Sequence, residues 1–227
     1  MFTVLRLAEE DLVAYGLCCK FLGEAFYRLP QPPLWQTILD EHLFETWPLS
    51  TDDPFTRTGL TLLTALTAQA RNDDATFDVL EDDYAALFVG PARLKAPPWE
   101  SVYRSRDHIM FEKQTREVRA FYASYGLQFN RINKEPDDHF GLELLFLAYL
   151  LGQALERREA GDTASQTQII GDVGQFLQAH TLHWAEAFLG RVINHAMTDY
   201  YRGIAYLAAG MLLTLCTKLA IPWELEL

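Results

Sequence analysis

Three adjacent side chains, Asp137, Asp138 and His139, form the one group in this sequence with an evident capacity for chemistry. A carboxylate beside an imidazole can act as a general base or supply ligands to a metal ion. A carboxylate can also accept hydrogen bonds from a guanidinium group. The alternative is structural, because the helix dipole stabilises acidic residues in a first helical turn by about 0.3–1 kcal/mol each. The residues alone leave capping and chemistry both open.

Pro136 predicts the start of a helix that carries these three residues and runs to about residue 158. In such a helix Asp138 would share a face with Leu142, Leu145 and Tyr149. A charged acceptor at the border of an apolar wall suits a ligand that is basic at one end and apolar at the other.

Evidence for an enzyme is weak. The chain has no Glu-x-x-His pair of the kind that helical di-iron proteins use, and no Gly-x-x-x-x-Gly-Lys loop for phosphates. His180, His183 and Glu186 lie at helical spacing and could touch one ion, although such a group is more often a solvated helix face. We therefore predict a protein that is not an enzyme and holds no metal or cofactor. The alternative is a metal-dependent or acid/base hydrolase centred on Asp138 and His139.

A second feature is the aromatic stretch from Tyr84 to Tyr103. A helix from about residue 76 should end near Val89, because Gly90 can close it and the proline that follows forbids continuation. Pro97 and Pro98 then stiffen the backbone, so Trp99 and Tyr103 should be presented on a pre-ordered segment. A rigid segment loses little entropy on binding a ligand.

Three motifs carry a resemblance to a known family: Leu-Phe-Val-Gly-Pro at 87–91, Pro-Pro-Trp-x-Ser-Val-Tyr at 97–103 and Glu-Pro-Asp-Asp-His-Phe-Gly at 135–141. Together they resemble the TorD/DmsD family of redox-enzyme maturation chaperones, and within it the DmsD branch most. The resemblance implies an all-helical cytoplasmic protein. It also implies a partner, the twin-arginine leader of a molybdopterin-containing reductase subunit, held until cofactor insertion and export.

By this resemblance a set of residues would bind the leader: Tyr84, Leu87, Phe88, Pro98, Trp99, Glu100, Ser101, Tyr103, Asp138 and His139. Trp99 would be the apolar anchor, Leu87 and Phe88 the groove floor, and Asp138 the guanidinium acceptor. For Leu87 and Phe88 the alternative is ordinary core. His139 would either donate an orienting hydrogen bond or tune binding by titrating near pH 6.5. Glu100 stands where DmsD-type relatives often carry glycine, so it would add a charge for arginine or reshape the loop.

Composition narrows the class of partner. The chain has 227 residues, 49% of them hydrophobic, and a net charge of −12 from 19 basic and 31 acidic residues. This charge argues against nucleic acid and anionic membranes as partners. The longest apolar run, 204–216, is too short to cross a bilayer, and no export signal is evident at the N-terminus. We expect a cytoplasmic protein, with Cys18, Cys19 and Cys216 as small core residues.

Helical periodicity recurs throughout, which predicts an all-α fold. We expect one domain over residues 1–227, with 90–100 as a candidate hinge between two helical halves, and a monomer or a helix-swapped dimer exchanging segments at 93–98 or 160–165. The expected helices cover about 9–29, 34–44, 54–70, 76–89, 104–125, 136–158, 167–179, 182–194 and 198–219, with Asp53 as an N-cap and the segment 127–133 briefly extended.

Overall fold

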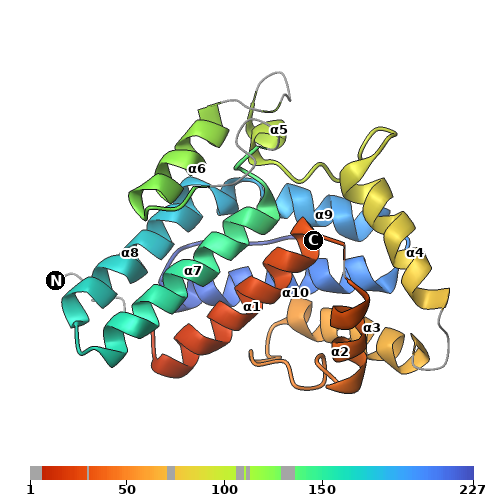
Figure 1. Cartoon of the computed structure of the whole chain (residues 1–227), viewed down its shortest axis with the longest axis horizontal. Coiled ribbons are helices and arrows are strands. Elements are labelled where there is room, and N and C mark those ends of the chain that lie inside the picture. Colours follow the sequence, from red (N-terminus) through yellow and green to blue (C-terminus); the bar gives the residue numbers. More distant parts are fainter. Residues whose placement is uncertain (1–6, 30, 71–74, 106–109, 111–112, 129–135) are drawn as a thin grey trace. The chain divides into compact units, whose positions relative to one another are not determined.

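The computed structural model describes residues 7–29, 31–70, 75–105, 110, 113–128 and 136–227. The described residues form helices and connecting loops and no strand, so the all-α prediction is confirmed (Figure 1). They divide into two compact units. The first unit combines 1–27, 98–185 and 213–224, and the second combines 28–97, 186–212 and 225–227. One boundary falls between Pro97 and Pro98, inside the candidate hinge, whose motion stays a prediction.

The first unit is built around two antiparallel helices, α1 (Glu9–Tyr27) and α7 (Phe140–Glu159), which lie side by side (Figure 1). They touch where Gly23 meets Gly141: a Cβ atom on Gly141 would lie 2.6 Å from the carbonyl oxygen of Gly23. Only glycine permits so close an approach of two backbones. The unit also contains α5 (Glu100–Arg104), α6 (Lys113–Ser124), α8 (Thr163–Ala179) and a 3₁₀ turn, η2 (Thr181–His183).

Aromatic rings fill the interior of the first unit. Phe146 lies 4.8 Å from Tyr122 and 4.9 Å from Phe176 between ring centroids, which joins α6, α7 and α8. At the other end of α7, Phe140 contacts Phe26 at 5.1 Å and Trp184 at 5.3 Å. These rings hold the start of α7, and therefore the residues just before it, in a rigid setting.

The second unit holds α2 (Pro32–Asp40), α3 (Pro54–Ala70), α4 (Ala75–Tyr84) and a π-helical turn, η1 (Ala85–Val89). The helices α9 (Ala185–His195) and α10 (Asp199–Lys218) supply it with residues 186–212. The predicted cap of α3 is confirmed, because the Thr56 amide donates to Asp53 Oδ1 at 2.7 Å. Buried Asp83, at the end of α4, accepts from the Thr198 amide at 2.8 Å and its hydroxyl at 2.6 Å, which fixes the start of α10.

Two of the expected helices were placed wrongly. The helix predicted from Pro136 begins at Phe140, so Asp137 and Asp138 precede it. The helix predicted over 104–125 is two helices, because α5 ends at Arg104 and Ser105 is extended at φ −79° and ψ 148°. Gly126 ends α6 with a φ of 69°, as expected. Phe111, which was expected on the apolar face of that helix, and most of the segment expected to be extended, 127–133, lie outside the described residues.

Smaller corrections concern helix ends. The helix predicted over 34–44 ends at Asp40, and the one predicted from 167 begins at Thr163, where Asp162 caps it through the Ser165 amide at 3.1 Å. The helix predicted over 182–194 is η2 followed by α9. Cys18, Cys19 and Cys216 are buried free thiols, as predicted.

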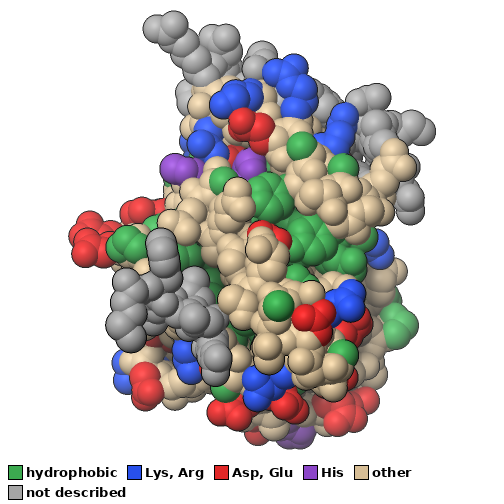
Figure 2. All heavy atoms as spheres, turned by 90° about the vertical axis from the view of Figure 1, so that its left-hand side faces the viewer, with side chains coloured by type: hydrophobic (Ala, Val, Ile, Leu, Met, Phe, Trp, Pro, Cys, Tyr) green, Lys and Arg blue, Asp and Glu red, His purple; other side chains and the backbone are tan. Residues whose placement is uncertain are grey.

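Within the described residues no helix combines the length and apolar character that a membrane crossing needs. Acidic and basic side chains are intermingled over the face drawn in Figure 2.

Candidate functional site

Two of the three motifs meet in the first unit. Trp99 and His139 form an isolated antiparallel β-bridge. On either side of it the Phe140 amide donates to the Pro98 carbonyl at 2.8 Å, and the Glu100 amide donates to the Asp138 carbonyl at 2.9 Å. We call this contact between 98–101 and 137–141 the Trp99–His139 junction.

Asp138 caps the N-terminus of α5 from a distant segment, while Trp99 is the N-cap residue of that helix. Asp138 Oδ2 accepts from the Ser101 amide at 2.7 Å and Asp138 Oδ1 accepts from the Thr115 hydroxyl at 2.7 Å. The side chain is fully buried, and burial raises the pKa of its carboxyl although the hydrogen bonds from Ser101 and Thr115 oppose the rise. Asp138 lies outside α7, so the prediction that it shares a helix face with Leu142, Leu145 and Tyr149 is wrong.

His139 is the N-cap of α7. Its Nδ1 accepts from the Gly141 amide at 3.0 Å. Between ring centroids, the imidazole lies 5.1 Å from Tyr27 and 6.1 Å from Trp99. Burial lowers the pKa of the imidazole to about 3. His139 is therefore neutral throughout the physiological range, and the hypothesis that it titrates near pH 6.5 is wrong.

Asp137 forms an ion pair with a residue that the sequence did not single out. Arg119 on α6 donates to Asp137 Oδ2 from Nε at 2.9 Å and from Nη2 at 2.6 Å. The Tyr122 hydroxyl donates to the Asp137 carbonyl at 3.2 Å. Both aspartates thus join the segment before α7 to neighbouring helices, but only Asp138 has a capping role, and it caps α5 rather than the expected helix.

Glu100 is also fully buried and has internal partners. It pairs with Arg104 and lies 3.0 Å from Nδ1 of His180, which is itself buried. The interpretation of His180 as part of a solvated helix face is therefore wrong. Glu143 on α7 is also buried and is influenced by the charge of Glu100. Burial and this negative charge raise the pKa of the Glu143 carboxyl well above its ordinary value. The first unit thus buries four carboxyl groups, of Glu100, Asp137, Asp138 and Glu143, at or close to one junction.

The aromatic residues of this region remain partly accessible. Trp99 and Tyr103 are half-buried, whereas Pro98 and Ser101 are buried. The Tyr103 ring packs 5.3 Å from that of Trp184. Among the described residues, the indole N–H of Trp99 has no hydrogen-bond acceptor. Such an unpaired buried donor is uncommon and calls for an explanation.

The remaining predicted site residues belong to the second unit. Leu87 and Phe88 lie in η1 and are 0% and 4% exposed, and Phe88 packs on Tyr201 and Phe188 at 5.7 and 6.1 Å. Tyr84 is half-buried beside Phe88. Gly90 ends the turn at φ 99° and ψ −166°, a conformation open to glycine alone. Leu87 and Phe88 are thus interior residues of this unit, and their contact with a ligand stays a prediction.

In the described part of the chain, no three His, Cys, Asp or Glu side chains converge to hold a metal ion. The residues that build the junction and that the sequence did not single out are Tyr27, Thr115, Arg119 and Glu143. Tyr27 lies in α1, and Thr115 and Arg119 lie in α6, so no local pattern could have indicated these three; Glu143 lies in α7 itself, one turn after His139.

Comparisons with known proteins agree with the motifs. A family model described as the nitrate reductase delta subunit matches residues 52–190. The chain belongs to this family, that of the TorD/DmsD chaperones. It is 32% identical over 197 residues to the chaperone protein YcdY of Escherichia coli, covering 84% of this chain and 88% of YcdY.

Two further relatives of the family are similar over shorter or more divergent alignments. The Tat proofreading chaperone DmsD of Salmonella typhi is 27% identical over 212 residues, 92% of each chain. The chaperone protein TorD of Vibrio cholerae is 29% identical over 147 residues, 65% of this chain and 64% of TorD. The family confirms the prediction of a redox-enzyme maturation chaperone rather than an enzyme, and the hydrolase alternative finds no support.

Proposed function

We propose that this chaperone works in the cytoplasm, binds the twin-arginine leader of a molybdopterin-containing reductase subunit, and holds it until cofactor insertion and export. The observation that carries the proposal is the Trp99–His139 junction. It joins the two motif segments that resemble leader-binding segments of the family into one structural element. The relative named a Tat proofreading chaperone supports the same function.

Within the junction, we assign direct contact with the leader to Trp99 and Tyr103. They are the aromatic residues of the two motifs that keep exposed surface, and aromatic rings supply much of the energy of peptide interfaces. The unpaired indole N–H of Trp99 is a donor that a leader carbonyl can satisfy after a small side-chain movement.

Asp138 and His139 act on the leader indirectly in this proposal. Their polar atoms hold α5 and α7 in place, so they position Trp99. A guanidinium contact with Asp138 would compete with the Ser101 and Thr115 donors. The leader contacts of Tyr84, Leu87 and Phe88, and the identity of the group that accepts the arginines, stay predictions.

Calorimetric titration with a synthetic leader tests the proposal, with a matched peptide in which lysines replace both arginines. We expect micromolar or tighter binding that the lysine peptide weakens, because lysine cannot form a bidentate pair. Trp99→Ala should weaken leader binding by roughly 30-fold, which corresponds to an aromatic hot-spot loss of about 2 kcal/mol. Trp223→Ala, a half-buried tryptophan of the same unit, is the control and should leave affinity unchanged.

No binding of any leader by folded wild-type protein would contradict the proposed function. Equal losses for the Trp99 and Trp223 variants would retain leader binding but remove it from the junction.

A further inference from the structure

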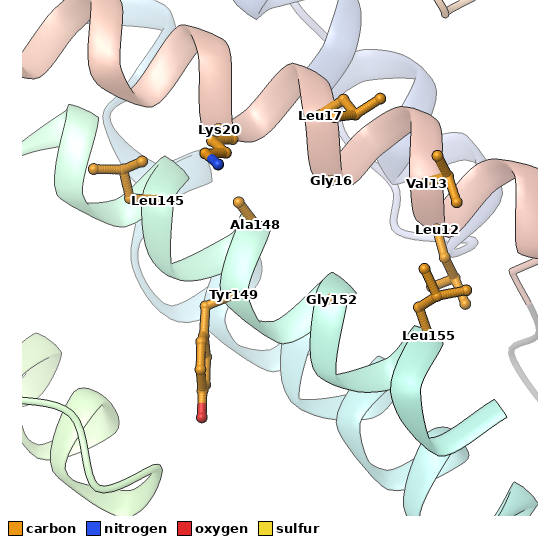
Figure 3. Close-up of a pocket in the computed structure, with 10 residues that line it drawn as sticks. All are labelled: Leu12, Val13, Gly16, Leu17, Lys20, Leu145, Ala148, Tyr149, Gly152 and Leu155. Carbon is orange, nitrogen blue, oxygen red and sulfur yellow. The ribbon is translucent and has the colours of Figure 1, made fainter. Parts of the chain in front are cut away.

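An apolar groove of about 410 Å³ runs between α1 and α7 in the first unit. Most of its lining is hydrophobic or small, and Lys20 is the one charged residue among Leu12, Val13, Gly16, Leu17, Lys20, Leu145, Ala148, Tyr149, Gly152 and Leu155. Figure 3 shows Val13, Leu17 and Lys20 on the α1 side of the groove and Leu145, Ala148 and Leu155 on the α7 side.

The groove is a wedge that opens away from the contact between Gly23 and Gly141. At that contact the two backbones touch, whereas a Cβ on Gly152 would meet nothing within 4 Å and one on Gly16 only Leu151 at 3.8 Å. The small residues therefore leave a hollow, and the groove has no side chain of its own to fill it.

A ridge stands beside this hollow. Val13 is 43% exposed and Leu17 is 56% exposed, one turn apart on α1. Together with the apolar lining of the hollow, these exposed side chains form a contiguous apolar patch, a feature of interaction surfaces. Ridge and hollow lie side by side on one helix pair, so a helix laid along α1 would cover the ridge and border the hollow.

The charges on the two sides of this ridge are opposite. Lys20 lines the groove at one end, and the same helix stripe continues one turn beyond Val13 at the other end as Glu9 and Glu10. Glu9 pairs with Arg158 at 3.3 Å, whereas among the described residues neither Lys20 nor Glu10 forms an ion pair. On α7 the stripe likewise continues beyond Leu155 as exposed Glu156 and Glu159.

We propose that the groove is a homodimer interface, in which α1 of one copy crosses α1 of a second copy antiparallel about a twofold axis. An isologous contact requires that each pairing occur twice, once in each direction. With the axis midway between Val13 and Leu17, Leu17 of each copy meets Val13 of the other. The same register places Lys20 of each copy opposite Glu10 of the other, so the apolar and the charged pairings agree on one arrangement.

A parallel arrangement satisfies neither pairing, because it places Lys20 against Lys20 and the glutamates against each other. An apolar helix of another protein fits the hollow but gives no reason for the opposite charges at equal distances from the ridge. The second copy is therefore the occupant that the surface favours, independently of whether the chaperone binds a leader.

Sedimentation velocity of the full chain over a wide concentration range tests this interface. We expect wild type to pass from monomer to dimer as its concentration rises. Leu17→Asp should raise the dimer dissociation constant at least about tenfold, because each copy would bury an unpaired carboxylate. Val79→Asp changes an equally exposed aliphatic residue of the second unit, 50% exposed, and should have no effect.

A charge exchange tests the register. Lys20→Glu and Glu10→Lys should each weaken the dimer several-fold, because each places two pairs of like charges in contact. The double variant Glu10→Lys/Lys20→Glu restores both pairs with reversed signs and should return the dissociation constant to within about twofold of wild type.

Three results would overturn the proposal. One is a monomeric wild type at every concentration. Another is a dimer that is indifferent to Leu17→Asp, as a helix-swapped dimer would be. The last is a Leu17→Asp variant with lost leader affinity and unchanged sedimentation, which would assign the groove to the leader.

Discussion

Replacing Glu143 by Gln is expected to stabilise the protein at neutral pH and to change how its stability depends on pH. Glu143 is fully buried, and burial together with the charge of Glu100 raises the pKa of its carboxyl well above the ordinary value. The nearby Thr181 and Trp184 side chains only partly offset this rise. The folded protein therefore keeps a proton on Glu143 at pH values where the unfolded chain, with a pKa of about 4.3, has lost it.

The sign and the slope follow from proton linkage. Between about pH 4.3 and the raised native pKa, the native state holds one more proton than the unfolded state at this site. The free energy of unfolding therefore falls as pH rises, by up to about 1.4 kcal/mol per pH unit from this group. Below that window both states are protonated, and above it both are ionised, so the contribution is constant. Glutamine at this position stays neutral at every pH, so the variant does not lose this part of the free energy of unfolding as pH rises.

Urea unfolding followed by circular dichroism at a series of pH values measures this difference. We expect the free-energy gap between Glu143→Gln and wild type to widen with pH across the window and then to level. Glu117→Gln, at a carboxylate with 45% exposed side chain, is the matched control and should give a small, constant gap. Parallel curves for Glu143→Gln and wild type would refute the raised native pKa.

Two further predictions concern helix packing and capping. Gly141→Ala should destabilise the protein by about 1–3 kcal/mol or more, because the new Cβ would lie 2.6 Å from a backbone oxygen. Gly171→Ala on α8 should stabilise it by about 0.5–1 kcal/mol, because the new Cβ would meet nothing within 4 Å. Chemical denaturation of both variants checks this, and equal effects would contradict the close α1–α7 contact. Asp83→Asn should cost about 1–3 kcal/mol, because an amide nitrogen cannot accept the donors at the start of α10. An unchanged melting temperature would show that this cap is dispensable.

Local signals in the sequence predicted local features of the fold. Asp53 followed by Pro54 predicted a capped helix start, and Gly126 predicted a helix end, because each acts through its own backbone or its nearest neighbours. The motifs around Trp99 and His139 were likewise identified correctly as belonging to the TorD/DmsD family.

The sequence did not predict those parts of the site in which hydrogen bonds and ion pairs join distant segments. Pro136 is an ordinary signal for a helix start, but the side chain of Asp138 caps α5 and that of His139 caps α7. The helix therefore begins only at Phe140. His180 is buried because Glu100 on another helix lies against it. Such partners are fixed by tertiary packing, which the spacing of residues along one helix cannot reveal.

Leader contact at the Trp99–His139 junction is the central claim, and amide hydrogen exchange with and without bound leader tests it most directly. We expect bound leader to slow exchange of the amides in α5 and of the Phe140 and Gly141 amides. Protection confined to other segments, with no change in these amides at saturating leader, would contradict it.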